Sequence, residues 1–363
     1  MSSQANLHSL KLSALDRAVL NLPKIDLHRH LEGSLRLDTL VEVARQYQLD
    51  LPHTAEALRP LVQVVNNNGD YLDFLSKFHV LRHFYASPEI IQRFAYEAVA
   101  DAAADNIKYL ELRFTPKAVA ASRGFPLAEA TDWVIDAVQK ASADFDLPVA
   151  LIISLNRHEG LDLAEAMTRI AIDRRHRGVV ALDLGGNEAD FSADPFVPLF
   201  REAIQGGLKT IAHAGEWNGP ENVRHAIEQL QVVRVGHGVR IVEDFNVVRL
   251  ASERNICFEV CITSNLQSGV VRRAGDHPLR DMYHLQLRCT LNTDDPTLSG
   301  IVLTDEYQLA LRALGLAFDD LKKMLLVAAE SALLPDAERL QLRDQFRTLL
   351  DAISNPISDF PVA

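Results

Sequence analysis

The sequence predicts a parallel (β/α)8 barrel of the TIM type, with a helical insertion after the first strand. Three observations support this fold class. Eight short apolar runs alternate with longer amphipathic segments, no fixed-period repeat is present, and the polar residues best suited to chemistry follow the ends of the runs. In a parallel sheet with both faces covered, strands appear as continuous apolar runs rather than as alternating patterns.

The eight runs are short, and most are rich in Val, Ile or Leu. They predict strands over Lys24–His28, Lys108–Phe114, Val149–Ser154, Val179–Leu184, Lys209–His213, Val232–His237, Ile256–Val260 and Arg288–Asn292. Helical periodicity between them predicts helices over Leu127–Phe145, Leu161–Arg177, Pro220–Gln229 and Glu243–Arg254. We expect residues 1–363 to form one domain, because barrels of this kind often reach this length.

The connection after the first strand is unusually long and is expected to form a helical insertion over residues 31–107. Within it, Leu72, Leu75, Phe78 and Leu81 recur at helical spacing. A helix packed on the barrel explains most of them, and a lid over the barrel mouth is the alternative. Residues from about 335 to 363 are charged and helical in pattern, and we expect them to form a C-terminal extension without chemistry of its own.

Composition limits the classes of partner. The chain has 49 acidic and 37 basic residues and a net charge of −12, which works against nucleic-acid binding through the phosphate backbone. Its three cysteines do not form a disulfide framework, and we expect them to be small buried packing residues. The N-terminal stretch lacks the apolar core of a signal peptide, and no run reaches transmembrane length. These features predict a cytoplasmic protein with a small-molecule partner.

Four candidate metal ligands follow predicted strands. His28 and His30 are two residues apart at the end of the first strand, so their side chains are expected to point to the same side. Alone, this pair is no better than chance among 13 histidines. His213 ends the fifth strand and Asp294 follows the eighth. Because strand ends converge on one face of a barrel, three imidazoles and one carboxylate form a credible zinc set with a position left for water.

Three further residues near these ligands are candidates for proton transfer. Glu216 follows His213 by three positions beside a glycine turn, and a carboxyl group there can act as acid or base. His237 lies between two glycines at another strand end, where close backbone approach, for example by substrate, is possible. Asp295 is next to Asp294, and adjacent carboxylates are best tolerated near a cation. Each motif also has a structural explanation, as a core histidine, a tight turn or a helix cap.

Several other metal chemistries are disfavoured. The His-x-Glu of residues 30–32 is not followed by the Pro-Cys-x-x-Cys of cytidine-type deaminases, and no His-Glu-x-x-His helix is present. Neither a GxGxxG fingerprint nor a P-loop occurs. The fourth strand ends in LDLGGNE, without the lysine that would bridge two metals, so the sequence favours one zinc per chain.

Together, the motifs resemble the adenosine and adenine deaminase family of barrel hydrolases. The resemblance runs from about Lys24 to about Tyr307 and rests on the ordered set HRHLEG, LELRFTP, LDLGGNE, HAGE, GHG and NTDDP. It implies that His28, His30, His213 and Asp294 bind one zinc ion, that Glu216 protonates the ring nitrogen beside the attacked carbon, and that His237 and Asp295 orient and deprotonate the attacking water.

The resemblance also implies a substrate pocket. His30 and Asp295 would contact the substrate, Gly186 would meet the purine ring through its backbone, and Glu32 would reach the sugar side. The segment YLDFLSKF is similar to the hydrophobic gate of the family, so its aromatic residues are candidate pocket residues: Tyr71, Phe74 and Phe78.

The choice of purine substrate is less sharply indicated. The segment DLGGNE and Gly236 resemble the adenosine branch, whereas Glu32 and Asn187 stand where aspartates are usual in that branch. We therefore expect a purine nucleoside, with adenosine and deoxyadenosine favoured. Adenine and aminodeoxyfutalosine remain alternatives, as do an amide or pterin substrate and a non-catalytic zinc-binding barrel.

Overall fold

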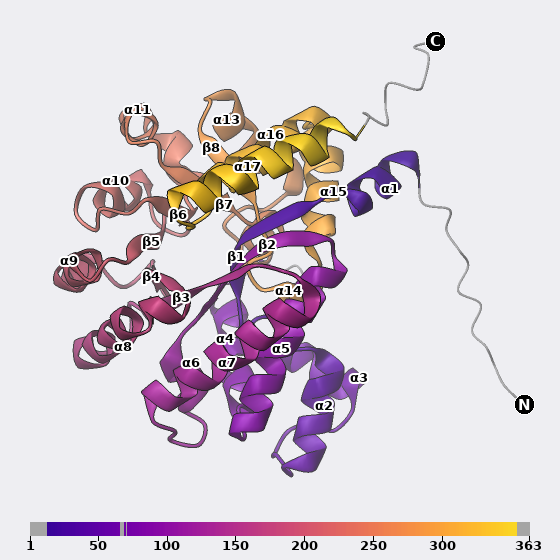
Figure 1. Ribbon diagram of the computed structural model, residues 1–363, viewed down its shortest axis with the longest axis vertical. Coiled ribbons are helices and arrows are strands. Elements are labelled where there is room, and N and C mark those ends of the chain that lie inside the picture. Colours follow the sequence, from indigo (N-terminus) through magenta and orange to yellow (C-terminus); the bar gives the residue numbers. More distant parts are fainter. Residues whose placement is uncertain (1–12, 66–68, 70, 354–363) are drawn as a thin grey trace, which may run out of the picture.

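The computed structural model describes residues 13–65, 69 and 71–353. Eight parallel strands form one sheet in sequence order, and the helices surround it (Figure 1). This is the predicted (β/α)8 barrel. The strands are β1 (Lys24–His30), β2 (Ile107–Phe114), β3 (Val149–Asn156), β4 (Val179–Gly185), β5 (Lys209–Ala214), β6 (Arg234–His237), β7 (Cys257–Val260) and β8 (Arg288–Leu291).

The described helices lie outside the strands. They are α1 (Ala14–Asn21), α2 (Leu37–Gln46), α3 (Ala55–Val62), α4 (Tyr71–Leu81), η1 (Arg82–Phe84), α5 (Pro88–Ala104), α6 (Pro116–Ala120), α7 (Leu127–Phe145), α8 (Leu161–Asp173), η2 (Arg175–Arg177), η3 (Asp194–Phe196), α9 (Val197–Gln205), α10 (Pro220–Glu228), η4 (Val239–Glu243), α11 (Phe245–Glu253), α12 (Ile262–Gln267), η5 (Ala274–Asp276), α13 (Leu279–His284), α14 (Pro296–Ser299), α15 (Leu303–Leu314), α16 (Phe318–Ser331) and α17 (Asp336–Asp351).

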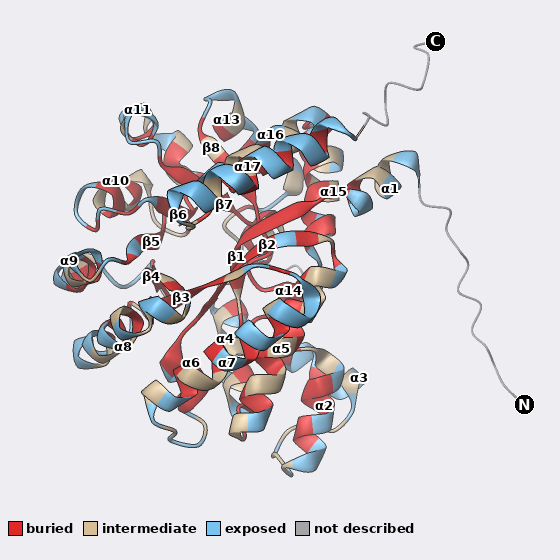
Figure 2. Ribbon diagram, in the orientation of Figure 1, coloured by how far each residue is buried: buried red, intermediate tan, exposed pale blue. Residues whose placement is uncertain are grey.

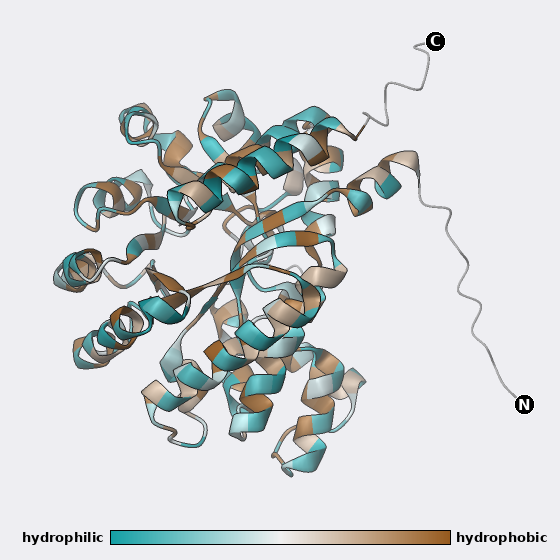
Figure 3. Cartoon of the chain, in the orientation of Figure 1, coloured by the Kyte–Doolittle hydropathy of each residue, from teal (hydrophilic) through white to brown (hydrophobic). Residues whose placement is uncertain are grey.

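The strands are almost entirely buried, and the helices are exposed mainly on their outward sides (Figure 2). The hydropathy of the helices follows the same division, with hydrophilic residues facing outward (Figure 3). This pattern explains why the strands were recognisable as continuous apolar runs. None of the helices in the described part of the chain is long and apolar enough to cross a membrane.

The barrel closes between β8 and β1 with help from side chains. Asn292 Oδ1 accepts a hydrogen bond from the Leu27 N–H at 2.9 Å, and Thr293 Oγ1 donates to Asp26 at 2.6 Å. Beyond them, His30 N–H donates to the Asp294 carbonyl at 2.8 Å, and Asp294 N–H donates to the His28 carbonyl at 2.8 Å. The backbone of Asp294 is therefore fixed directly beside both histidines of β1.

All eight predicted strands are present, and the differences are at their ends. Strand β6 begins at Arg234 rather than Val232, because the Val232 N–H returns to the Ala226 carbonyl at the end of α10. Strand β7 begins at Cys257, since the Ile256 N–H bonds to Ala251 of α11. Helix α11 begins at Phe245, because the side chain of Asp244 caps it by accepting the Asn246 N–H. All three cysteines are buried, as predicted.

The insertion contains α2 to α5, and α17 forms the C-terminal extension. Helix α4 faces the barrel mouth, where its side chains line a cavity. Helix α17 packs through Leu342, Phe346 and Leu350. The predictions for the extreme N-terminus, residues 1–12, and for the last ten residues of the extension, 354–363, lie outside the described residues.

Candidate metal centre and active site

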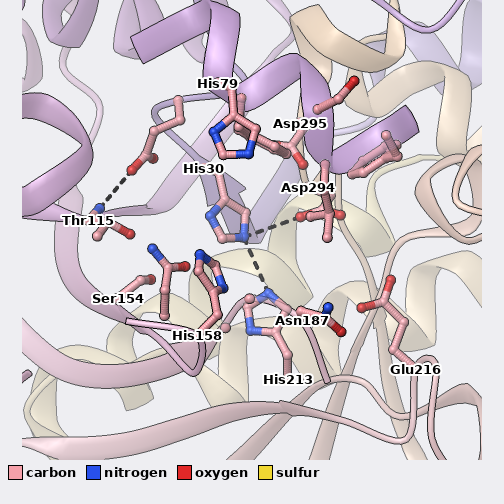
Figure 4. A pocket seen from close by; sticks show the side chains of 18 of the residues that line it. His30, His79, Thr115, Ser154, His158, Asn187, His213, Glu216, Asp294 and Asp295 are labelled. Atoms are coloured by element: carbon pink, nitrogen blue, oxygen red, sulfur yellow. Dashed lines mark hydrogen bonds and ion pairs between the residues drawn. The ribbon is translucent and has the colours of Figure 1, made fainter. Parts of the chain in front are cut away.

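Four side chains from three strand ends converge at the carboxyl end of the barrel. The ligand atoms of His28, His30, His213 and Asp294 lie within 4.8 Å of one another. His30 Nε2 is 3.3 Å from His213 Nε2, while Asp294 Oδ1 is 3.2 Å from His28 Nε2 and 3.3 Å from His30 Nε2. Figure 4 shows His30, His213 and Asp294 pointing toward one another, with Glu216 across the pocket from Thr115. The structure brings together the whole predicted ligand set.

Two of the histidines carry their ring protons on the nitrogen that points away from this centre. The lone pair on the other ring nitrogen of each histidine therefore faces the centre. His28 Nδ1 donates to Glu259 Oε2 at 2.8 Å, and His213 Nδ1 donates to Asp183 Oδ1 at 3.2 Å. A carboxylate only accepts, so each proton is on Nδ1 and each Nε2 carries a lone pair. Among the described residues, His28 Nε2 is buried without a hydrogen-bond partner. Converging lone pairs beside a carboxylate fit a divalent cation, and the donor set of nitrogen and oxygen suits zinc.

A buried arginine lies between the two carboxylates that hold these histidines. Arg113 Nη2 is 2.7 Å from Glu259 Oε2, and its Nη1 is 3.4 Å from Asp183 Oδ2. Burial raises the pKa of both acids, but nearby positive groups outweigh burial and hold each pKa well below the usual range. These groups are His213, Arg113 and His28 for Asp183. For Glu259 they are Arg113, Arg234 and His28. Both carboxylates therefore stay ionised and accept from the histidines.

Two of the candidate site residues have a left-handed backbone. The φ angles of His237 and Asp294 are 58° and 61°, a region that non-glycine residues rarely occupy and that often marks functional sites. At Gly236, the group that approaches the backbone closely is the side chain of His28. A Cβ at Gly236 would lie 2.9 Å from His28 Cε1.

Glu216 lines the cavity beside the metal centre, and Glu188 positions it. The carboxylate of Glu188 accepts backbone N–H bonds from Gly215, Glu216 and Trp217 at 2.7, 2.9 and 2.9 Å. Burial, Asp294 and Glu188 raise the pKa of Glu216 well above its usual value. Its surroundings therefore favour the protonated carboxyl group, which can donate a proton.

Asp295 and His237 also line the cavity. Burial and the neighbouring acids Asp294, Glu32 and Glu216 raise the pKa of Asp295, and its Oδ1 is buried without a hydrogen-bond partner among the described residues. His237 Nε2 lies 3.8 Å from Asp294 Oδ2. Repulsion between these neighbouring carboxyl groups contributes to the raised pKa values of Glu216 and Asp295, and a bound cation would relieve it.

The cavity has a volume of about 340 Å³ and extends from the metal centre to α4. Of the aromatic residues expected at a substrate pocket, Phe74 and Phe78 line this cavity, together with Gly186 and Asn187. Tyr71 is not among the lining residues, and its ring lies 5.4 Å from that of Trp217, which does line the cavity.

Glu32 also lines this cavity. Its Oε1 accepts the Thr115 N–H at 2.8 Å, whereas Oε2 is buried without a hydrogen-bond partner among the described residues. Burial raises the pKa of Glu32 to about 7. One carboxyl oxygen is therefore fixed by the protein, and the other remains available to a polar group of a ligand.

Sequence analysis missed the residues that hold the site in place. Asp183 and Glu188 lie in the motif LDLGGNE, which we used as a family signature and as evidence against a second metal, without assigning a role to either acid. Glu259 lies within β7, and a carboxylate inside an otherwise apolar run was a signal that could have indicated it. Asn265 on α12 was also missed, although it contacts both Glu216 and His237.

A known protein family matches this chain along most of its length. A family model described as adenosine deaminase matches residues 23–349. An adenosine deaminase from Aliivibrio fischeri is 35% identical over 327 residues, covering 90% of this chain and 98% of that protein. An adenosine deaminase from Edwardsiella ictaluri is 38% identical over 323 residues, covering 89% and 97%.

The fold is also similar to that of solved hydrolases. An amidohydrolase from Burkholderia ambifaria, whose crystal structure contains bound Zn, is 28% identical and superposes with a TM-score of 0.85. The match covers 96% of this chain and 97% of that protein.

Proposed function

The chain belongs to the adenosine deaminase family, and on that premise we propose that it hydrolyses adenosine and deoxyadenosine to inosine, or deoxyinosine, and ammonia. One observation carries the proposal. Glu216, a buried carboxyl group with a raised pKa, lines the same cavity as His30, His213 and Asp294 of the four-residue cluster. Hydrolytic deamination of a purine needs this combination of an activated water and a proton donor.

We propose one zinc ion per chain, held by His28, His30, His213 and Asp294. When bound, such an ion lowers the pKa of a coordinated water from 15.7 to about 7, which makes a nucleophile available at neutral pH. The open cavity beside the cluster supports this assignment, because catalytic zinc sites keep one position for water.

The surrounding residues would then divide the proton transfers. Glu216 donates its proton to N1 of the purine as water adds to C6, which avoids negative charge on the ring. Burial and Asp294 raise the pKa of Asp295, and a cation bound at Asp294 would offset this effect, so that the unpartnered Oδ1 of Asp295 would accept the proton of the water while His237 would orient that water. The proton taken up by Asp295 then passes to the exocyclic amino group, which leaves the tetrahedral carbon as ammonia. The C6 hydroxyl gives up its proton as the C6 carbonyl forms, and that proton restores Glu216.

Binding residues follow from the shape of the cavity. We propose that the backbone at Gly186 meets the purine ring, that Phe74 and Phe78 cover it, and that His30 and Asp295 lie against the reacting side. The free oxygen of Glu32 would take a sugar hydroxyl. Tyr71 would act indirectly, by supporting Trp217 at the cavity wall.

Ammonia release from a panel of substrates tests this proposal. The zinc-loaded protein is assayed with adenosine, deoxyadenosine, adenine and aminodeoxyfutalosine. We expect the highest kcat/KM with the first two. A clear preference for adenine would indicate an adenine deaminase. A preference for aminodeoxyfutalosine would indicate that Glu32 contacts the sugar side of a modified nucleoside. Absence of ammonia from all four, with zinc bound, would contradict the deaminase assignment.

A further inference from the structure

The connection between β7 and β8 carries a buried amide that contacts both the proposed proton donor, Glu216, and His237, which is proposed to orient the attacking water. Asn265 on α12 is completely buried. Its Nδ2 lies 3.4 Å from Glu216 Oε1 and 3.1 Å from His237 Nδ1. A carboxamide nitrogen has two hydrogens and no acceptor, so it can donate one hydrogen bond to each partner.

The orientation of this amide is fixed from its other side. Asn265 Oδ1 lies 3.2 Å from His277 Nε2, and His277 Nδ1 lies 3.1 Å from the backbone N–H of Leu279. A backbone N–H can only donate, so His277 Nδ1 is an acceptor and the ring proton is on Nε2. That proton is donated to Asn265 Oδ1. Burial lowers the pKa of His277 to about 3, so its ring is uncharged and has only this one proton.

The donors and acceptors therefore form a directed chain that begins at a backbone amide. Rotating the amide of Asn265 by 180° would place its NH2 group against the Nε2–H of His277, and two donors would face each other. In the observed orientation, Asn265 donates to His237 Nδ1. His237 must then carry its own proton on Nε2, the nitrogen that faces Asp294 and Glu216 at 3.8 and 3.7 Å.

We propose that His277 and Asn265 are positioning residues that set the tautomer of His237 and the proton position of Glu216. With its proton on Nε2, His237 donates a hydrogen bond into the active site and does not accept the proton of the attacking water. That proton goes to Asp295. Since Glu216 Oε1 accepts from Asn265, the acidic proton of Glu216 is on Oε2. The inference rests on the proposed function for its catalytic meaning, but the tautomer itself is a property of the protein without substrate.

Nitrogen NMR of the zinc-loaded enzyme tests the tautomer directly. The protein is labelled with 15N-histidine, and the His237 signals are assigned by their loss in His237→Gln. The 15N shifts and ring couplings distinguish a proton on Nε2 from one on Nδ1. We expect Nε2–H for both His237 and His277. A proton on Nδ1 of His237 in the wild-type enzyme would overturn the proposal, whatever the variants do and whatever substrate the enzyme prefers.

Two substitutions at position 265 separate positioning from a purely structural role. Asn265→Asp keeps the size of the side chain and the acceptor for His277 but presents an acceptor to His237 Nδ1, which reverses the tautomer. Asn265→Leu removes every hydrogen bond but imposes no tautomer. At pH 8 we expect kcat to fall by about 100-fold or more in Asn265→Asp and by less in Asn265→Leu. Losses of this size lie within the contribution that general acid–base catalysis makes to rate. A purely structural role predicts the opposite order, and that result would overturn the proposal.

A substitution at His277 provides the matched control. The side chain of Gln carries both a donor for Asn265 and an acceptor for the Leu279 N–H, whereas Phe carries neither. We expect His277→Gln to retain the Nε2–H signal of His237 and most of kcat, and His277→Phe to lose both. If folded His277→Phe had the same kcat as His277→Gln and an unchanged His237 tautomer, the positioning role of His277 would be contradicted. If the proposed function is wrong, none of the substrates will release ammonia, even though His237 and His277 have the expected tautomers.

Discussion

Asp183 Oδ1 accepts a hydrogen bond from His213 Nδ1 at 3.2 Å, and thereby turns the lone pair of His213 Nε2 toward His30 and Asp294. Such partners orient metal ligands, and their loss typically costs 10- to 100-fold in metal affinity. We predict that Asp183→Asn weakens zinc binding by about 10- to 100-fold, measured by competition with a chromophoric chelator. Asp173→Asn, on the exposed end of α8, is the control. Equal zinc affinity in the two variants would show that Asp183 does not position His213.

Gly33 leaves the space that the side chain of Asp295 occupies. A Cβ at position 33 would lie 1.9 Å from Asp295 Oδ1, while a Cβ at Gly160 would meet no atom within 4 Å. We predict that Gly33→Ala displaces Asp295 and lowers kcat by at least about 100-fold, because the acceptor for the proton of water moves. Zinc content should remain near one per chain, since Asp295 is not a proposed ligand. Gly160→Ala should retain full activity, and a similar loss in both variants would argue against this explanation.

Glu216 is predicted to act as an acid and not as a ligand. Glu216→Gln keeps the shape of the side chain and an acceptor for Asn265, but it has no acidic proton. We expect kcat to fall by about 100- to 10,000-fold with zinc still bound at one per chain, measured by metal analysis and ammonia release. Full activity in Glu216→Gln would remove the residue from the mechanism.

Glu306 should give the folding stability a defined pH dependence. Its buried carboxylate accepts the N–H groups of Ile262 and Thr263 at 2.6 and 3.0 Å, and burial raises its pKa from 4.5 to about 7. Between these values the folded state holds a proton that the unfolded state has released, so stability falls as pH rises from 4.5 to 7. The shift corresponds to about 3 kcal/mol.

Glu306→Gln removes this titration, so its stability should fall less than that of the wild type over the same interval. Urea unfolding at pH 5 and pH 7.5 measures both changes. Comparing the changes rather than the absolute stabilities corrects for the hydrogen bond that Gln loses at every pH. An identical pH dependence in the two proteins would show that Glu306 does not titrate in this range.

The sequence was most informative where one physical pattern dominated. Runs such as Val149–Ser154 predicted strands because both faces of a parallel sheet are covered, and strand ends predicted where His213 and Asp294 would meet. It was least informative for polar residues whose partners are distant along the chain. Glu259 contacts His28 across 231 positions, and no local pattern indicates such a pairing. The start of β6 also depended on a backbone bond of Val232 that apolar periodicity does not reveal.

Adenosine turnover before and after metal reconstitution tests the central claim most directly. The protein is stripped with a chelator, assayed for inosine and ammonia together, and assayed again after addition of one equivalent of Zn²⁺. The account predicts negligible turnover by the stripped protein, and restored turnover with one ammonia released per inosine when one zinc is bound per chain. Equal activity in the stripped and reconstituted proteins, or no inosine from the protein with zinc bound, would contradict it.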